Sequence, residues 1–131
     1  MIHPKELRVG NLVLIKGWDS KVDTINCACN DATITVEGAA PDTFYKKEDI
    51  RGKPITSSWL IGVGFKRFGI FHQWYEENGY SIFRKGAGWQ LSHYVEYGST
   101  DGVDKYIGQP MEHIHQLQNL YFYLTFKELL Q

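Results

Sequence analysis

The C-terminal stretch from residue 109 to 130 carries the longest helical hydrophobic pattern in the chain and constrains how the rest can fold. Pro110 suits the first position of a helix, and Glu112 follows in the first turn, where a carboxylate favours the positive helix end. The apolar residues span an arc of about 200°, wider than the stripe of a helix covered on one side. They are Met111, Ile114, Leu117, Leu120, Tyr121, Phe122 and Leu124. We expect a helix over 111–124, covered on one side by its own sheet and on the other by a loop or a second chain.

A second helix start follows directly. Thr125 and Glu128 have the spacing of a capping box, in which each side chain bonds to the other's backbone N–H. This spacing predicts a short helix over 126–130.

Size and charge limit the class of protein. The 131 residues include 14 Lys and Arg against 15 Asp and Glu, for a formal net charge of −1. A domain of this length buries roughly two-thirds of its unfolded surface, so it can fold without disulfides or metals. A chain this close to neutral is poorly suited to duplex nucleic acid or an anionic membrane. We expect a single domain, residues 1–131.

The cysteines and the N-terminus bear on localisation. Cys27 and Cys29 are the only cysteines, and two positions along a strand separate them by about 7 Å, too far for a relaxed disulfide. Residues 1–8 lack the apolar run of a signal peptide, and no stretch approaches the roughly 20 apolar residues that span a bilayer. These features predict a soluble, cytoplasmic protein with free thiols.

The first third of the chain has the pattern of a small antiparallel unit. Residues 7–16 predict a first strand that is bent or bulged at Gly10. A second apolar stretch covers 22–29, and 33–37 alternates as a returning strand. These pieces predict a bent antiparallel sheet or a small SH3-like barrel, followed over 39–54 by a connecting loop with one short strand.

A short helix should follow Pro54. Thr56 or Ser57 can cap one to two helical turns, which the glycines at 62 and 64 end.

The remaining stretch predicts a β-meander. Asn78-Gly79 favours a tight hairpin turn between strands at 71–76 and 80–84, because both central residues of that turn need positive φ. A third strand begins near Trp89, and a fourth covers 103–107. A meander followed by a covering helix is an α+β fold.

Three segments resemble a family of small uncharacterised proteins encoded by gut-type Bacteroidetes genomes, their phages and mobile elements. They are ELRVGNLVL (6–14), PITSSWLIGVGF (54–65) and HIHQLQNLYFYLTFKELL (113–130). The family's middle segment reads Pro-Ile-x-Leu-Thr-x-x-Trp-Leu-x-x-x-Gly-Phe, and here Ser57 stands in place of the usual Thr. The resemblance implies an accessory protein of a phage or mobile element, and it implies no activity, ligand or catalytic residue.

The sequence offers no clear catalytic or metal centre. His113 and His115 would lie about 200° apart on a regular helix and could not share a metal, so capping or exposed positions are expected for them. Cys27 and Cys29 lack a second ligand pair at zinc spacing. The chain contains no G-x-S-x-G elbow and no phosphate-binding glycine motif. We expect no cofactor and no metal, and lean against an enzyme.

Gln118 stands out because it falls within the apolar arc of the helix, between Ile114 and Met111. Gln118 and Tyr121 are the candidate structural or partner-facing residues of this helix. An unpaired buried amide there would cost about 1–3 kcal/mol. The favoured interpretation is that Gln118 bonds a backbone group and fixes the helix. The alternative is that this part of the helix faces a cavity or a partner.

Cations and aromatic rings recur together in the meander. The candidate ligand-binding residues are Lys66, Arg67, Trp74, Arg84, Lys85 and Trp89. Stacking rings beside cations suit planar anionic ligands such as nucleotides. Because Trp74 and Tyr75 alternate, only one can face outward, and we favour Trp74. The competing interpretation is that the rings fill the core and the cations are simply solvated.

Three functions therefore remain. The first is a non-enzymatic binding protein that acts on a host protein or a small nucleotide signal and so antagonises host defence. The second is a nucleic-acid-associated module, and the third is a nucleotide hydrolase. The wide apolar arc and the aromatic content also predict a homo-oligomer.

Overall fold

The computed structural model describes residues 1–26, 31–68, 73–75, 79–97 and 101–129, with the side chains of 68, 73–75, 94–97 and 101–104 left out. Cys27, Cys29 and Asn78 lie outside the described residues. Where the sequence predicts a single domain, the chain forms two compact units. The first comprises Met1–Pro54 and the residues from His113 onward, and the second comprises Ile55–Glu112.

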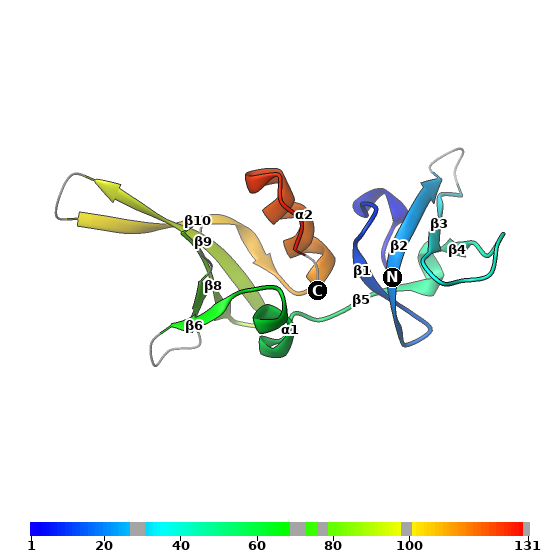
Figure 1. The fold of residues 1–131 in the computed structure, drawn as a ribbon, viewed down its shortest axis with the longest axis horizontal. Helices are drawn as coiled ribbons and strands as arrows, with labels where there is room; N and C mark the ends of the chain where they lie inside the picture. The colour runs from blue at the N-terminus through cyan, green and yellow to red at the C-terminus, as the bar shows by residue number, and fades with distance from the viewer. Residues whose placement is uncertain (27–30, 69–72, 76–78, 98–100, 130–131) are drawn as a thin grey trace. The chain divides into compact units, whose positions relative to one another are not determined.

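The first unit contains a five-stranded antiparallel sheet with the strand order β4-β3-β2-β1-β5, coloured blue to cyan in Figure 1. A C-terminal helix, α2, completes it. The elements are a 3₁₀ turn at Pro4–Glu6, β1 (Leu12–Ile15), β2 (Trp18–Asn26), β3 (Thr33–Val36), β4 (Tyr45–Lys46), a 3₁₀ turn at Lys47–Asp49, β5 (Ile50–Gly52) and α2 (Ile114–Thr125).

The first strand is shorter than predicted because its first half folds into a turn. Asn11 Oδ1 accepts a hydrogen bond from Arg8 N, and Gly10 has a φ of 92°. The strand then ends in a two-residue hairpin at Lys16 and Gly17, both with positive φ, as a type I′ turn requires.

Strand β2 gives the sheet its bend. Its first part pairs with β1 and its second part with β3, with a register shift between Val22 and Thr24. The sheet encloses a core of Ile2, Leu7, Val13, Ile15, Val22, Ile34, Val36 and Ile50. A bent antiparallel sheet is thus confirmed. Strands β4 and β5 are the ends of the strand order, so in the described residues the sheet is not a closed barrel.

Helix α2 buries the predicted face, with Ile114, Leu117 and Tyr121 inside and Leu124 half-buried. Its predicted start is wrong, because Pro110 and Met111 belong to a strand and His113 is the N-cap. The prediction of a second, short helix is also wrong, because residues 126–129 are not helical. The Thr125 hydroxyl donates to Tyr121 O and accepts from Lys127 N, so Thr125 closes the first helix.

The second unit combines α1 (Ser57–Gly62) with a five-stranded antiparallel meander of order β10-β9-β8-β7-β6. The strands are β6 (Lys66–Phe68), β7 (Gln73–Tyr75), β8 (Tyr80–Lys85), β9 (Gly88–Tyr97) and β10 (Asp101–Met111), drawn green to orange in Figure 1. The α1 cap is confirmed, because Thr56 Oγ1 accepts from Trp59 N. The predicted α+β class and meander are confirmed as well.

The chain leaves and re-enters the first unit at adjacent points. Pro54 and His113 form an isolated antiparallel bridge, and Ile114 N donates to Lys53 O over 2.8 Å. Within the second unit, Ile55 N bonds Glu112 O over 3.1 Å. The second unit is therefore an insertion between two paired residues of the first.

Candidate binding surfaces

The four cations predicted to form one patch divide between the two faces of the second unit's sheet. Arg84 lies opposite Trp89, and Lys85 lies opposite Gly88. Because successive strand residues point to opposite faces, Arg84 and Lys85 are separated. The same alternation separates Lys66 from Arg67 in β6. The four cations therefore do not form the single patch that was predicted from their adjacent positions in the sequence.

Of the two tryptophans predicted to stack on a ligand, only Trp89 has a described side chain. Trp89 is only 5% exposed, and the Arg84 guanidinium carbon lies 5.5 Å from its ring centroid. A ring this buried belongs to the core and does not offer a free stacking face. Trp74 is the cross-strand neighbour of Ile82, and its side chain lies outside the description. An outward Trp74 remains a prediction.

The structure instead brings Lys85 together with Phe83 and Tyr106. The Lys85 Nζ lies 4.7 Å from the Tyr106 ring centroid, and the Phe83 and Tyr106 centroids are 5.4 Å apart. Sequence reasoning missed both rings, because their proximity depends on how β8, β9 and β10 pair. The only local signal was the alternation that puts Phe83 and Lys85 on one face.

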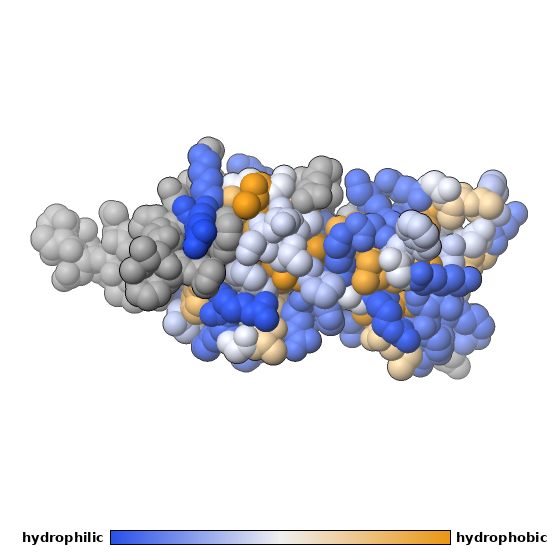
Figure 2. Space-filling view, turned by 90° about the horizontal axis from the view of Figure 1, so that it is seen from below, coloured by the Kyte–Doolittle hydropathy of each residue, from blue (hydrophilic) through white to orange (hydrophobic). Residues whose placement is uncertain are grey.

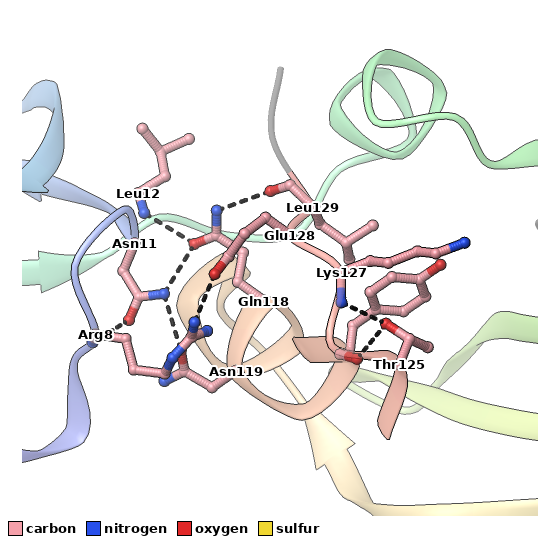
Figure 3. A network of polar contacts seen from close by, with 10 residues as sticks. Arg8, Asn11, Leu12, Gln118, Asn119, Thr125, Lys127, Glu128 and Leu129 are labelled. Carbon is pink, nitrogen blue, oxygen red and sulfur yellow. Dashed lines mark hydrogen bonds and ion pairs between the residues drawn. The ribbon is translucent and has the colours of Figure 1, made fainter. Parts of the chain in front are cut away.

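Gln118 has the structural role that the sequence favours. Its Oε1 accepts from Leu12 N at 2.9 Å and from Asn11 Nδ2 at 3.4 Å, and its Nε2 donates to Leu129 O at 3.0 Å (Figure 3). The buried amide therefore joins α2, the start of β1 and the segment that follows the helix. Tyr121, one turn further on, is buried.

Arg8 joins this region to an aromatic group at the end of α2. Its Nη2 pairs with Glu128 Oε1 at 2.5 Å (Figure 3). The guanidinium carbon of Arg8 lies 3.7 Å from the Phe122 ring centroid. Phe122 meets Phe126 edge to face, with centroids 6.2 Å apart. We call Phe122, Tyr123 and Phe126 the C-terminal aromatic cluster. Tyr123 and Phe126 are 78% and 81% exposed.

Phe126 is unusual in its backbone as well as in its exposure. It ends α2 in the left-handed conformation, with a φ of 58°. Glycine is the usual residue there, because a side chain in this conformation is strained. A large aromatic residue at such a position, with its ring in water, gains no burial to offset the strain.

Other large apolar side chains are exposed at separate points. In the described part of the chain they include Met1, Val9, Trp18, Phe44 and Ile61. On the face drawn in Figure 2, hydrophobic residues (orange) form small spots among hydrophilic ones. The C-terminal aromatic cluster is distinguished by the contacts of Phe122 with Phe126 and with Arg8.

The two helix-start histidines occupy different environments. His113 is the extended N-cap of α2, so the angular argument for a regular helix does not apply to it. Its capping position is confirmed, and the rings of His113 and His115 stack with centroids 5.7 Å apart. His115 is 2% exposed, which corrects the expectation of an exposed residue, and its Nδ1 has no hydrogen-bond partner among the described residues. Burial, with a smaller contribution from His113, lowers the pKa of His115 to about 4.

A surface hollow of about 280 Å³ lies in the first unit. It is lined by His3, Pro4, Asp31, Ala32, Lys46, Lys47 and Glu48. Its charged side chains are exposed and of both signs, so it favours no single class of ligand.

Across the described ranges, no three His, Cys, Asp or Glu side chains gather closely enough to hold a metal ion. No helix in the same ranges is both long and apolar enough to cross a bilayer. Comparison with protein-family models, curated proteins and solved structures finds no match for this chain.

Proposed function

We propose that this chain is a non-enzymatic binding protein that recognises a host protein through the C-terminal aromatic cluster. The observation that carries the proposal is Phe126, which is left-handed and 81% exposed, three positions after Tyr123, which is 78% exposed. Backbone strain of this kind is concentrated at functional positions. Exposed aromatic rings beside an arginine are also the composition that protein interfaces favour.

The contacts around Arg8 support this proposal. Stacking on Phe122 and pairing with Glu128 hold the guanidinium against the cluster. Gln118 fixes the following segment through Leu129 O. The segment that carries the rings is therefore held in place before binding, and a partner would not need to order it.

The biological setting follows from the resemblance described in the sequence. An accessory protein of a phage or mobile element would act in the host cytoplasm, and binding a component of host defence would antagonise it. This setting gives the proposal a defined source of partners, the proteins of a Bacteroidetes host.

The test compares matched surface variants for binding to host protein. Phe126→Gly and Tyr123→Ser remove exposed rings, and Trp18→Ser removes an equally exposed ring from the β1–β2 hairpin as a control. Immobilised proteins are exposed to host lysate, and any protein retained is purified and titrated by calorimetry. We expect Phe126→Gly to weaken that binding at least about 30-fold, the effect of losing a hot spot.

Folding is measured in parallel. Phe126→Gly relieves the left-handed strain but loses the edge contact with Phe122, so unfolding free energy should change by less than about 1 kcal/mol. Equal binding by wild type and Phe126→Gly, or equal loss with Trp18→Ser, would refute this surface.

The second candidate is a nucleic-acid-associated module. The order β4-β3-β2-β1-β5, with a 3₁₀ turn between β4 and β5, follows the strand order of a small SH3-type barrel and favours that finer fold assignment. Binding to oligonucleotides that weakens steeply with salt would support this candidate.

A further inference from the structure

One face of the second unit presents an aromatic corner beside a cation. Phe83, Lys85 and Tyr106 share this face, because Phe83 and Lys85 are two residues apart in β8 and Tyr106 approaches from β10. The Phe83 and Tyr106 rings are tilted by 53° at 5.4 Å, and Lys85 Nζ lies 4.7 Å from the Tyr106 centroid. Tyr106 remains 59% exposed.

Buried polar side chains hold this corner in place. Gln90 Nε2 donates to Ile107 O at 3.1 Å and to Gly108 O at 3.3 Å, directly after Tyr106. Ser92, the cross-strand neighbour of Tyr106, shares a 2.8 Å hydrogen bond with Ser81 through their hydroxyl oxygens. The strand that carries Tyr106 is therefore fixed to its neighbours, and little order has to be created when a ligand binds.

The chemistry of the corner defines a ligand. An exposed tyrosine ring stacks on a planar base, and a neighbouring lysine ammonium, here over the ring of Tyr106, binds a phosphate. Lys85 and Tyr106 are both exposed. The phosphate of a ligand can therefore bind the Lys85 ammonium while the base of the same ligand stacks on the Tyr106 ring. We propose that Phe83, Lys85 and Tyr106 form a site for a nucleobase joined to phosphate, supplied as a free nucleotide or as a single strand.

The site is independent of the C-terminal aromatic cluster, and its test uses different readouts. Wild type is titrated by calorimetry with purine and pyrimidine monophosphates, with cyclic nucleotides and with oligothymidylate. Tighter binding of the oligomer per site identifies a single strand as the source, and tighter binding of a monomer identifies a free nucleotide. Binding of either supports the proposal.

The variants assign binding to the corner. Tyr106→Ser should weaken binding by about fivefold to 150-fold, the range for losing one stacked base. Lys85→Gln should weaken binding and reduce the slope of log affinity against log salt by about one. Since both side chains are exposed, melting temperatures should match wild type.

Two controls locate the effect. Tyr123→Ser removes an exposed tyrosine from α2, and Lys47→Gln removes an exposed lysine from the first unit. Both should bind as wild type does. The proposal is overturned if wild type binds none of the probes at millimolar concentration, if Tyr106→Ser and Lys85→Gln bind normally, or if either control is equally impaired.

Discussion

At the scale of single residues, buried polar side chains decide much of how this chain is held together. Gln118 is the main example, because the hydrogen bonds of its side-chain amide reach Asn11, Leu12 and Leu129, all outside its own helix. Two of these partners are backbone groups, Leu12 N and Leu129 O. They would remain without a protein partner if the amide were lost.

Gln118→Met tests this role, because it keeps the shape of the side chain and removes its hydrogen bonds. We expect the free energy of unfolding to fall by about 2–4 kcal/mol, since each buried group left unpaired costs about 1–3 kcal/mol. Urea unfolding measures the loss. Tyr123→Met, at an exposed position of the same helix, should stay within about 0.5 kcal/mol of wild type. A similarly small loss for Gln118→Met would mean that water replaces the amide.

His115 predicts how stability depends on pH. Its folded-state pKa of about 4 lies below the ordinary value of 6.5, so between these values the unfolded chain binds more protons. The stability that comes from keeping His115 neutral is present above pH 6.5 and is lost as pH falls toward 4. This loss should reach about 3 kcal/mol at the acid end.

The measurement compares urea unfolding from pH 4 to 7 in wild type and His115→Gln. The variant should lose this part of the pH dependence, whereas His3→Gln should keep it. Parallel stability curves for wild type and His115→Gln would show that His115 is protonated without penalty.

At the scale of elements, the turn into α2 depends on a close approach between its N-cap and β5. A Cβ on Gly52 would overlap the ring of His113. The absence of a side chain at this one position therefore lets the helix start beside the strand. Gly52→Ala should lower stability by about 1–3 kcal/mol through overpacking.

A double-mutant cycle distinguishes overlap from a general effect on the strand. The effect of Gly52→Ala should be much smaller when His113 is also alanine, because the overlapping ring is gone. Additive losses in thermal unfolding would argue instead for strain within β5.

The elements also show which structure the sequence could predict. Helix α1 was predictable because Thr56 caps it locally, and the buried face of α2 followed from its period. The predicted helix start at Pro110 was wrong. A proline suits the first turn of a helix, but it also suits an edge strand such as β10, where Pro110 lies. The predicted cap of a second helix at Thr125 was wrong, because the Thr125 hydroxyl donates to Tyr121 O in the preceding turn.

The candidate sites were harder to predict, because they depend on pairing between distant residues. The sequence places Lys85 among the candidate cations, but its ring neighbour Tyr106 comes from a strand that joins the sheet by way of β9. Trp89 was assigned to a surface, although the cross-strand register places it opposite Met111 in the core. The composition of the meander indicated that cations and aromatic rings would meet, but the register of the strands decides which of them do.

At the scale of the whole molecule, the described surface leaves many large apolar side chains in water. Eight are more than half exposed, and they come from both units. Such surface favours association between copies. We expect light scattering at high micromolar concentration to show a species of at least twice 15.1 kDa. A single 15.1 kDa species throughout would exclude a homo-oligomer under those conditions.

The bridge between Pro54 and His113 has a consequence for synthesis on the ribosome. Translation delivers the second unit as one uninterrupted segment, so it can fold while the ribosome is still adding later residues. The strands of the first unit are translated before the second unit and its helix α2 after it, so Gln118 can bond Leu12 only when α2 has emerged. The N-terminal sheet therefore stays incomplete while the whole of the second unit is translated.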